Sequence, residues 1–314
     1  MPGTLRAPGQ PAGTLNAALA ERLGLPAGVA VSAATIDAHA GVPGAGVASA
    51  DTMVLVMGTS SCHMLNSRVE RLAPGIAGVV EDGILPGFFG YETGQASVGD
   101  AFAWFVDTFG LSHQTLTRAA EPLPPGAGGV MAIDWLNGCR TPLMDGRLSG
   151  ALLGLTLSTR PEQLYRALLE ATAFGVRWIV DTLVEAGVPV ERFVTSGGLP
   201  LKSPLLMQIY ADVLNRPIAL AESDQPVALG AAIMGRLAAG ATGETRPPTG
   251  GSPVDVSSVV GAMARQRADI AYRPSSPESV AAYDALYRTY RRLTAGDGAV
   301  ADAMRVLRQH AGAA

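Results

Sequence analysis

A stretch at residues 193–237 decides the fold class: it reads FVTSGGLPLKSPLLMQIYADVLNRPIALAESDQPVALGAAIMGRL. Phe193–Ser196 and Pro217–Ala221 are β-prone, and each is followed by a helical run, Ser203–Leu214 and then Pro226–Leu237. Ser203 can cap the first of these helices, because serine hydroxyls accept from backbone N–H groups at a helix start. A strand–helix–strand–helix order implies parallel strands with helices packed on the sheet. The sequence therefore predicts an α/β fold.

A hairpin is predicted upstream of this stretch. Thr52–Met57 and Cys62–Leu65 are β-prone and flank the bend Gly58-Thr59-Ser60, which is typical of two antiparallel strands. The longest helix signal is Glu162–Ala186, with Ser158 or Thr159 as its cap and Pro161 near its first turn. Further predicted elements are helix Leu15–Leu23, strand Val29–Ile36, helix Val98–Phe109, strand Val130–Leu136 and helix Pro277–Leu293, capped by Ser276. Residues 1–14 indicate a loose lead-in, 242–257 a loop and 296–314 a C-terminal tail.

Composition limits the classes of function. The 314 residues are 48% hydrophobic, enough for a large core in one domain or two. A net charge of −4 disfavours a nucleic-acid binder, which needs a basic surface. Cys62 and Cys139 are too few for a disulfide framework, and the four histidines form no metal-ligand pattern. The most apolar helical run, Val227–Gly240, is interrupted by Arg236 and is too short to span a bilayer. We therefore expect a cytoplasmic protein that binds neither nucleic acid nor membrane.

Four segments could carry chemistry. Asp37 ends an apolar run and could act as a general base, although it could equally cap the next helix. Gly58-Thr59-Ser60 offers backbone N–H groups and hydroxyls to phosphate oxygens, although a hairpin bend needs glycine in any case. Gly197-Gly198, between a strand and a helix, would let a ligand approach the backbone, although such turns often bind nothing. Glu92 could accept hydrogen bonds from sugar hydroxyls or could be an ordinary loop carboxylate.

The order of these segments resembles a known family. Ile36-Asp37-Ala38-His39-Ala40-Gly41 followed by Met57-Gly58-Thr59-Ser60-Ser61-Cys62-His63-Met64 resembles the C-terminal half of the FGGY carbohydrate kinases. Within that family, residues 86–100, with Trp104-Phe105, and residues 133–142 look most like the L-ribulokinases. Residues 171–175, 196–198, 224–225 and 228–232 also fit, so the resemblance covers about 15–295, the expected nucleotide-binding domain.

The resemblance implies a fold, a reaction and a set of residues. The fold is an actin-like ATPase (ribonuclease H-like) domain, a mixed sheet with helices on both faces, in a kinase that uses ATP and Mg²⁺. Asp37 would be the general base, and Glu92 would contact the ketose. Gly58, Thr59 and Ser60 would form a phosphate-binding turn. The adenosine motif would comprise Gly197 and Gly198 with Leu199 and Lys202 nearby, and Asn137 and Gly138 would border the nucleotide.

One motif of the family is not found. The whole kinases begin with an N-terminal domain that holds an Asp-x-Gly-Thr hairpin, and these 314 residues contain no such motif. We therefore expect half of an L-ribulose kinase, weak or inactive until an N-terminal domain joins it in cis or in trans; a homodimer is left open. The alternatives are a kinase for another ketose or polyol, such as D-ribulose or xylulose, and a non-catalytic module that binds nucleotide or a partner.

Overall fold

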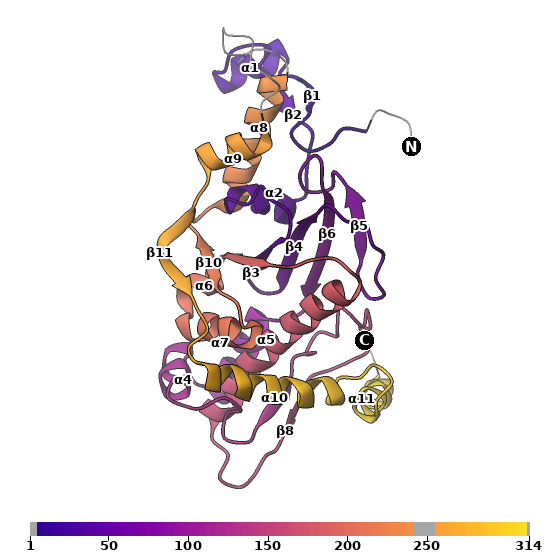
Figure 1. Ribbon diagram of the computed structural model, residues 1–314, viewed down its shortest axis with the longest axis vertical. Helices are drawn as coiled ribbons and strands as arrows, with labels where there is room; N and C mark the ends of the chain where they lie inside the picture. The colour runs from indigo at the N-terminus through magenta and orange to yellow at the C-terminus, as the bar shows by residue number, and fades with distance from the viewer. Residues whose placement is uncertain (1–4, 242–254, 313–314) are drawn as a thin grey trace.

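The computed structural model describes residues 5–241 and 255–312, which are built around one seven-stranded sheet (Figure 1). The strand order is β11-β10-β9-β3-β4-β6-β5. The bounds are β3 Thr52–Met57, β4 Ser61–Ser67, β5 Gly78–Glu81, β6 Phe89–Gln95, β9 Arg192–Ser196, β10 Ile218–Ala221 and β11 Gln266–Tyr272. The strands β3, β9 and β10 run parallel, whereas the remaining neighbours are antiparallel. The predicted mixed α/β sheet is confirmed.

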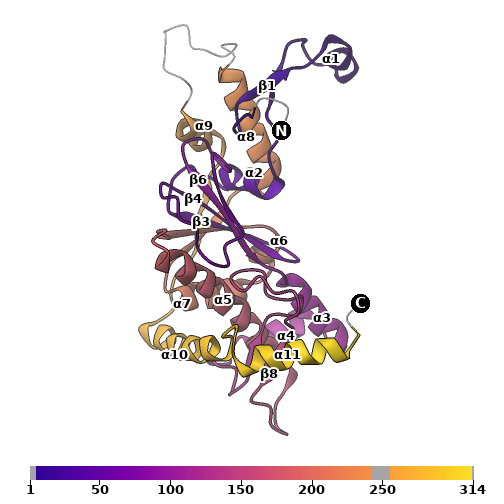
Figure 2. The ribbon, with the colours of Figure 1, turned by 90° about the vertical axis from the view of Figure 1, so that its right-hand side faces the viewer.

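Helices cover both faces of this sheet because its central strands are apolar on both sides. In β3, Met53, Leu55 and Met57 belong to one buried cluster, and Val54 belongs to another. The first cluster lies under α3 (Gly99–Phe109), α4 (His113–Ala120), α5 (Pro161–Glu185), α7 (Pro204–Leu214) and α10 (Pro277–Leu293). The second lies under α2 (Asp37–Gly44), α8 (Pro226–Ala241) and α9 (Val256–Met263), on the opposite side in Figure 2.

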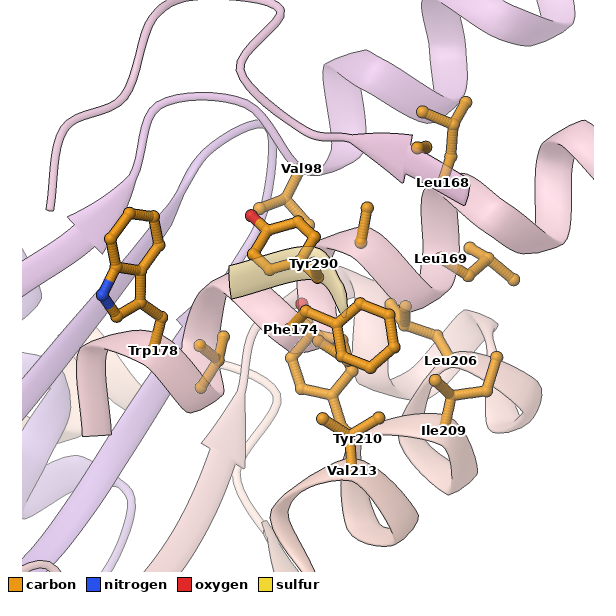
Figure 3. Close-up of a cluster of buried hydrophobic side chains, with 14 of the residues drawn as sticks. Val98, Leu168, Leu169, Phe174, Trp178, Leu206, Ile209, Tyr210, Val213 and Tyr290 are labelled. Atoms are coloured by element: carbon orange, nitrogen blue, oxygen red, sulfur yellow. The ribbon is translucent and has the colours of Figure 1, made fainter. Parts of the chain in front are cut away.

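The larger cluster is centred on α5, whose side chains are buried along most of its length. Figure 3 shows Phe174 and Trp178 of α5 with Tyr210 of α7 and Tyr290 of α10. The rings of Phe174 and Tyr290 lie 5.4 Å apart, within the range of favourable aromatic pairs. This packing holds the helix α10 against the rest of the cluster.

On the other face, α2 and α8 cross in close backbone contact. A Cβ atom added to Gly230 of α8 would lie 1.7 Å from the carbonyl oxygen of Ala40 in α2. A Cβ atom added to Gly44 of α2 would lie 1.7 Å from the carbonyl oxygen of Pro226. The two glycines therefore fix how close α2, which begins at Asp37, can lie to α8.

Several predicted elements are confirmed, including the hairpin of β3 and β4, the Ser203-capped α7 and the Ser276-capped α10. The predicted helix at residues 15–23 is α1 (Ala17–Leu23), and the predicted strand at 130–136 is the shorter β7 (Met131–Ile133), which pairs with β8 (Ala151–Leu153). No helix in the described part of the chain is both long and apolar enough to cross a membrane.

Other predictions about local structure were wrong. The lead-in contains a strand, β1 (Pro11–Thr14), because it pairs with β2 (Ala30–Ser32). The helix α5 is preceded by Arg160, not by Ser158 or Thr159 as cap; the Arg160 backbone N–H donates to Oε1 of Gln163 at 2.8 Å. The tail forms α11 (Ala299–His310), which buries Ala301 and Met304. The predicted loop lies outside the described residues over 242–254, and α9 begins at Val256.

Candidate functional site

Two glycine turns meet at one end of the sheet. The first, Gly58-Thr59-Ser60, joins β3 to β4, and the second begins at Gly197, directly after β9. Since β3 and β9 are parallel, with Val56 opposite Ser196, both turns follow the carboxyl ends of their strands and lie at the same end of the sheet. Gly197 has a φ of 101°, and a Cβ atom there would lie 2.3 Å from the carbonyl oxygen of Met57. Only glycine fits this conformation and this contact.

The first turn is held from behind by the start of α3. The Thr59 carbonyl accepts from the N–H groups of Val98 and Asp100, at 3.0 and 3.2 Å, and the Gly58 carbonyl accepts from Gly99 at 3.1 Å. Gly58, Thr59 and Ser60 are nevertheless exposed. A rigid, exposed glycine bend with two hydroxyls can donate hydrogen bonds to phosphate oxygens.

Asn137 is joined to this turn through Asp100. Its Nδ2 donates to Oδ2 of Asp100 at 2.9 Å, and Asp100 in turn binds the Thr59 carbonyl through its backbone N–H. Gly138 is buried with a φ of 81°, and a Cβ atom there would lie 2.8 Å from Cα of Gly146. Asn137 is exposed beside the turn, whereas loop packing already accounts for the glycine at 138.

The second turn continues into a short helix, α6 (Gly198–Lys202). Gly198 is exposed, and a Cβ atom there would meet nothing within 4 Å. Leu199 lies against the start of α3, since its Cδ1 is 3.4 Å from the Cβ position of Gly99. Lys202, the only lysine of the sequence, is exposed at the end of α6. The turn therefore presents open space beside Gly198, bordered by a leucine.

Asp37 is the first residue of α2. The N-cap position belongs to Ile36, so Asp37 is not the cap, and its Oδ1 accepts from the N–H of Ala38 at 2.8 Å. A carboxylate in the first turn is favoured by the helix dipole. Asp37 is exposed, so its carboxylate is accessible to a substrate hydroxyl.

A cleft that contains the Glu92 carboxylate, here called the carboxylate cleft, adjoins the start of α2, where Ile36 and His39 line it. Glu92 of β6 accepts from Nη2 of Arg140 and faces Nε2 of His39 at 3.3 Å. His39 donates from Nδ1 to the carbonyl of Gly83 at 3.0 Å, because a carbonyl can only accept. A cavity of about 770 Å³ adjoins this group, and its lining includes Gln10, Thr35, Ile36, His39, Asp82 and Glu92.

The strand that carries Glu92 is fixed by a buried polar network. Gln95 of β6 donates to Oδ2 of Asp134 at 2.8 Å and to the Thr172 carbonyl at 2.9 Å. Tyr290 donates to Oδ1 of Asp134 at 2.7 Å. Burial raises the pKa of Asp134, although the hydrogen bonds from Tyr290 and Gln95 act in the opposite direction. The network ties β6 to α10 and so keeps Glu92 in place.

His63 does not belong to the cleft. It is a fully buried residue of β4, and its Nε2 lies 2.9 Å from Oγ of Ser61. Burial lowers the pKa of His63 to about 3, with a smaller effect from Arg140. We conclude that it is a neutral structural histidine.

Sequence reasoning did not single out Arg140, which contacts both sides of the site. Besides Glu92, its Nη1 lies 3.6 Å from Sγ of Cys62, two residues beyond the Gly58-Thr59-Ser60 turn. The only sequence signal was its place within the stretch 133–142, which resembles the ribulokinases.

A divalent ion could be held here only in part by protein. Within residues 5–241 and 255–312, no three His, Cys, Asp or Glu side chains lie together as a metal site. Mg²⁺ commonly binds through one or two carboxylates plus substrate phosphates. The exposed carboxylate of Asp37 and the phosphate turn are compatible with that mode of binding.

Comparisons with known proteins identify the family. The model of the C-terminal domain of the FGGY family of carbohydrate kinases matches residues 53–239, more than half of the chain. The ribulokinase of Halalkalibacterium halodurans is 48% identical over 295 residues, which are 90% of this chain and 51% of that protein. The ribulokinase of Bacillus licheniformis is 44% identical over 298 residues, 91% of this chain and 52% of that protein. The chain thus spans about half the length of these relatives.

Solved structures agree on the fold. The xylulose kinase of Rhodospirillum rubrum matches with a TM-score of 0.78 and 28% identity, over 92% of this chain and 56% of that one. The kinase of Brucella ovis, described as a xyloylose kinase, matches with a TM-score of 0.80 and 27% identity, over 93% of this chain and 57% of that one. The expected fold is confirmed, and the chain belongs to the FGGY family of carbohydrate kinases.

Proposed function

We propose that this member of the FGGY family is the nucleotide-binding half of an L-ribulose kinase. The reaction would convert ATP and L-ribulose to ADP and L-ribulose 5-phosphate. The observation that carries the proposal is that the Gly58-Thr59-Ser60 turn and the Gly197 turn leave the parallel strands β3 and β9 side by side, with Gly197 against Met57, while His39 and Glu92 line a cleft at the start of α2. The choice of ketose is supported by ribulokinase relatives at 44% and 48% identity.

In this proposal, Asp37 is the general base. Its exposed carboxylate takes the proton of the primary hydroxyl of the sugar as that oxygen attacks the γ-phosphorus of ATP. The bond between the γ-phosphorus and the bridging oxygen to the β-phosphate breaks, and ADP leaves. Glu92 accepts hydrogen bonds from other sugar hydroxyls. The N–H groups and hydroxyls of Gly58, Thr59 and Ser60 bind phosphoryl oxygens.

The nucleotide would lie on the Gly197 turn, with adenosine in the open space beside Gly198 and near Leu199 and Lys202. Asn137 would border it from the α3 side, and Gly138 would shape that loop. Mg²⁺, when bound, would neutralise phosphate charge, and the exposed carboxylate of Asp37 could be one of its ligands. Because phosphoryl transfer depends mainly on positioning and charge stabilisation, the groups that face this site from the rest of a whole kinase matter greatly.

We therefore expect this chain alone to turn over very slowly, and an N-terminal kinase domain, on the same polypeptide or another, to restore the rate. Sugar-dependent ADP release by the pure chain at ordinary kinase rates, about 1–100 s⁻¹, would contradict this part of the proposal. A ketose panel that includes L-ribulose, D-ribulose and xylulose would test the substrate. Xylulose belongs in it because the solved structures that share this fold include a xylulose kinase.

The nucleotide site is tested by calorimetric titration of Mg-ATP into the chain and two tryptophan variants. Gly198→Trp fills the open space beside the turn, and it should weaken binding at least about tenfold. Gly261→Trp is the matched control: Gly261 lies on α9, and a Cβ atom there also meets nothing within 4 Å. We expect the control to bind like the unmodified chain. Equal binding by Gly198→Trp, or no binding by the unmodified chain, would refute a nucleotide half-site at this turn.

A further inference from the structure

Arg140 lies where the phosphate turn and the carboxylate cleft meet. It belongs to the segment between β7 and β8, yet its guanidinium reaches across two strands of the central sheet. Nη1 lies 3.6 Å from Sγ of Cys62 on β4, and Nη2 donates to Oε1 of Glu92 on β6. The Arg140 side chain is 32% exposed, as is that of Glu92, so the pair is desolvated on one side only.

The backbone around Arg140 is fixed to the same strand that carries Glu92. The N–H of Thr141 donates to the carbonyl of Gly94 at 3.2 Å, and the N–H of Gly94 donates to Oγ1 of Thr141 at 3.3 Å. A Cβ atom on Gly94 would lie 2.4 Å from the carbonyl oxygen of Ser61 and 3.2 Å from Nη1 of Arg140. Gly94 therefore leaves the space through which the guanidinium crosses the strand, two residues from Glu92.

The second oxygen of Glu92 is held as well. Oε2 lies 3.3 Å from Nε2 of His39, whose Nδ1 donates to the carbonyl of Gly83 at 3.0 Å. His39 donates to Glu92 when its ring carries the second proton, since Nδ1 already holds one. A carboxylate can accept about four hydrogen bonds, so two acceptor sites on Glu92 are left for a ligand. Oε1 is thus oriented by Arg140 before any ligand arrives, and Oε2 is oriented by His39 when that ring carries both protons.

We propose that Arg140 is a positioning residue of the sugar site, which keeps the Glu92 carboxylate aimed at a ligand that donates two hydroxyl groups. This inference rests on the proposed function, because it takes the sugar hydroxyls as the donors. Arg140 acts through Glu92 and does not itself contact the sugar. Its planar guanidinium suits this task better than a lysine, because it can donate to Glu92 from one nitrogen while another nitrogen faces Cys62.

The first test is a double-mutant cycle on L-ribulose affinity, measured by calorimetry. Arg140→Met and Glu92→Gln should each weaken binding about tenfold, the usual effect of losing one hydrogen bond to a charged group. If Arg140 acts through Glu92, the double variant should bind no more weakly than Glu92→Gln alone. Losses that multiply to about a hundredfold would show that Arg140 contacts the sugar directly, and would overturn the proposal.

Controls separate positioning from simple damage to the fold. Arg118→Met carries the same substitution on the exposed side of α4 and should bind L-ribulose like the unmodified chain. Arg140→Met should keep its Mg-ATP affinity, because the residue is not part of the Gly197 turn, and it should still unfold in urea in one cooperative transition. Arg140→Lys, which keeps the charge, should recover part of the lost affinity. Equal loss of ATP and sugar binding in Arg140→Met would indicate a structural role and contradict the inference.

A ligand-free measurement distinguishes failure of this inference from failure of the proposed substrate. In the NMR spectrum of the unliganded chain, a guanidinium held by a carboxylate rotates slowly and gives separate Nη signals for Arg140. Glu92→Gln should average these signals. Absence of L-ribulose binding with this response intact would reject the substrate and keep the positioning contact. Signals unaffected by Glu92→Gln would reject the positioning contact.

Discussion

Two alanine substitutions on α8, five residues apart, should have opposite effects on stability. A Cβ atom at Gly230 would lie 1.7 Å from the carbonyl oxygen and 2.6 Å from the carbonyl carbon of Ala40. A Cβ atom at Gly235 would meet nothing within 4 Å. Both residues lie within the same helix and have ordinary helical backbone, so intrinsic propensity favours alanine at each by about 1 kcal/mol. Any difference between the variants therefore reports the crossing of α2 and α8.

The magnitude follows from that contact. Because the neighbour of Gly230 is backbone and not a flexible side chain, α2 would have to move by more than about an ångström. Overpacking of this kind costs about 1–3 kcal/mol, and we expect the upper end here. After the gain in propensity, Gly230→Ala should lose about 2 kcal/mol of unfolding free energy. Gly235→Ala should gain about 0.5–1 kcal/mol.

The same displacement should be visible in ligand binding. Asp37 and His39 are carried by α2, whereas Glu92 is carried by β6, so a shift of α2 separates the two halves of the cleft. A misplacement of about 1 Å can cost about a hundredfold in rate. We expect Gly230→Ala to bind L-ribulose more weakly than the unmodified chain, and Gly235→Ala to bind it equally well.

Urea unfolding and calorimetry on the three proteins provide the measurement. Equal stability of the two variants would show that α2 and α8 can separate freely, and would refute close helix contact as the constraint on Asp37. Lower stability of Gly230→Ala without any change in sugar affinity would keep the packing argument and reject the link to the cleft.

Three further outcomes are expected. Asp37→Asn should reduce turnover at least about a hundredfold once an N-terminal half is supplied, with unchanged Mg-ATP affinity; retained turnover would exclude Asp37 as the base. Burial lowers the pKa of His63 to about 3, from about 6.5 in the unfolded chain. Below pH 6.5 the unfolded chain therefore binds a proton that the folded chain does not, and the free energy of unfolding should fall by about 1.4 kcal/mol per pH unit as the pH decreases toward 3. His63→Leu should therefore flatten the pH dependence of urea unfolding between pH 6.5 and 4.5, and an unchanged slope would contradict a neutral buried ring. At Gly197 the φ angle is 101° and an added Cβ atom would lie 2.3 Å from the Met57 carbonyl oxygen, so Gly197→Ala should lower the free energy of unfolding by about 3 kcal/mol. Gly198→Ala should leave it unchanged, because its Cβ atom meets nothing. Equal urea midpoints of the two variants would disprove backbone strain at Gly197.

The fold could be predicted from the sequence where the local hydrophobic pattern agrees with the tertiary packing. The β9-to-α8 region was predictable because its strands are apolar and its helices begin at Ser203-Pro204 and at Pro226. The strand β11, which reads QRADIAY, was missed because it is a polar edge strand, paired only to β10. The helix α11 was missed because its position depends on distant contacts: Arg305 donates to Asp145 at 3.0 Å. Local pattern cannot anticipate contacts of that kind.

The site residues fall into the same two groups, those with a local sequence signal and those that depend on distant contacts. The turns at Gly58 and Gly197 were found because glycine at a strand end has a local meaning, and the resemblance then assigned them roles. Arg140 was not found because its partner Glu92 lies 48 residues away on β6. His63 shows the reverse limit, since nothing in the sequence separates this fully buried histidine from the partly buried His39 of the cleft. Burial, and with it the protonation state, is settled by tertiary packing.

The balance of charged groups around the proposed phosphate position is the reason why we expect further cationic groups to be needed there. The Gly58-Thr59-Ser60 turn offers only neutral donors, and Arg140 is already paired with Glu92. In the proposed reaction, Asp37 would add a negative charge close to the γ-phosphoryl group, and Lys202 is exposed at the end of α6. The repulsion between two negative charges, here a carboxylate and a phosphoryl group, costs several kcal/mol at a separation of about 4 Å in a partly buried site, unless cations are close. Under the proposed function, those cations would come from Mg²⁺ and from groups facing the cleft, and we therefore expect nucleotide binding by this chain to be stronger evidence of its role than its rate of phosphoryl transfer.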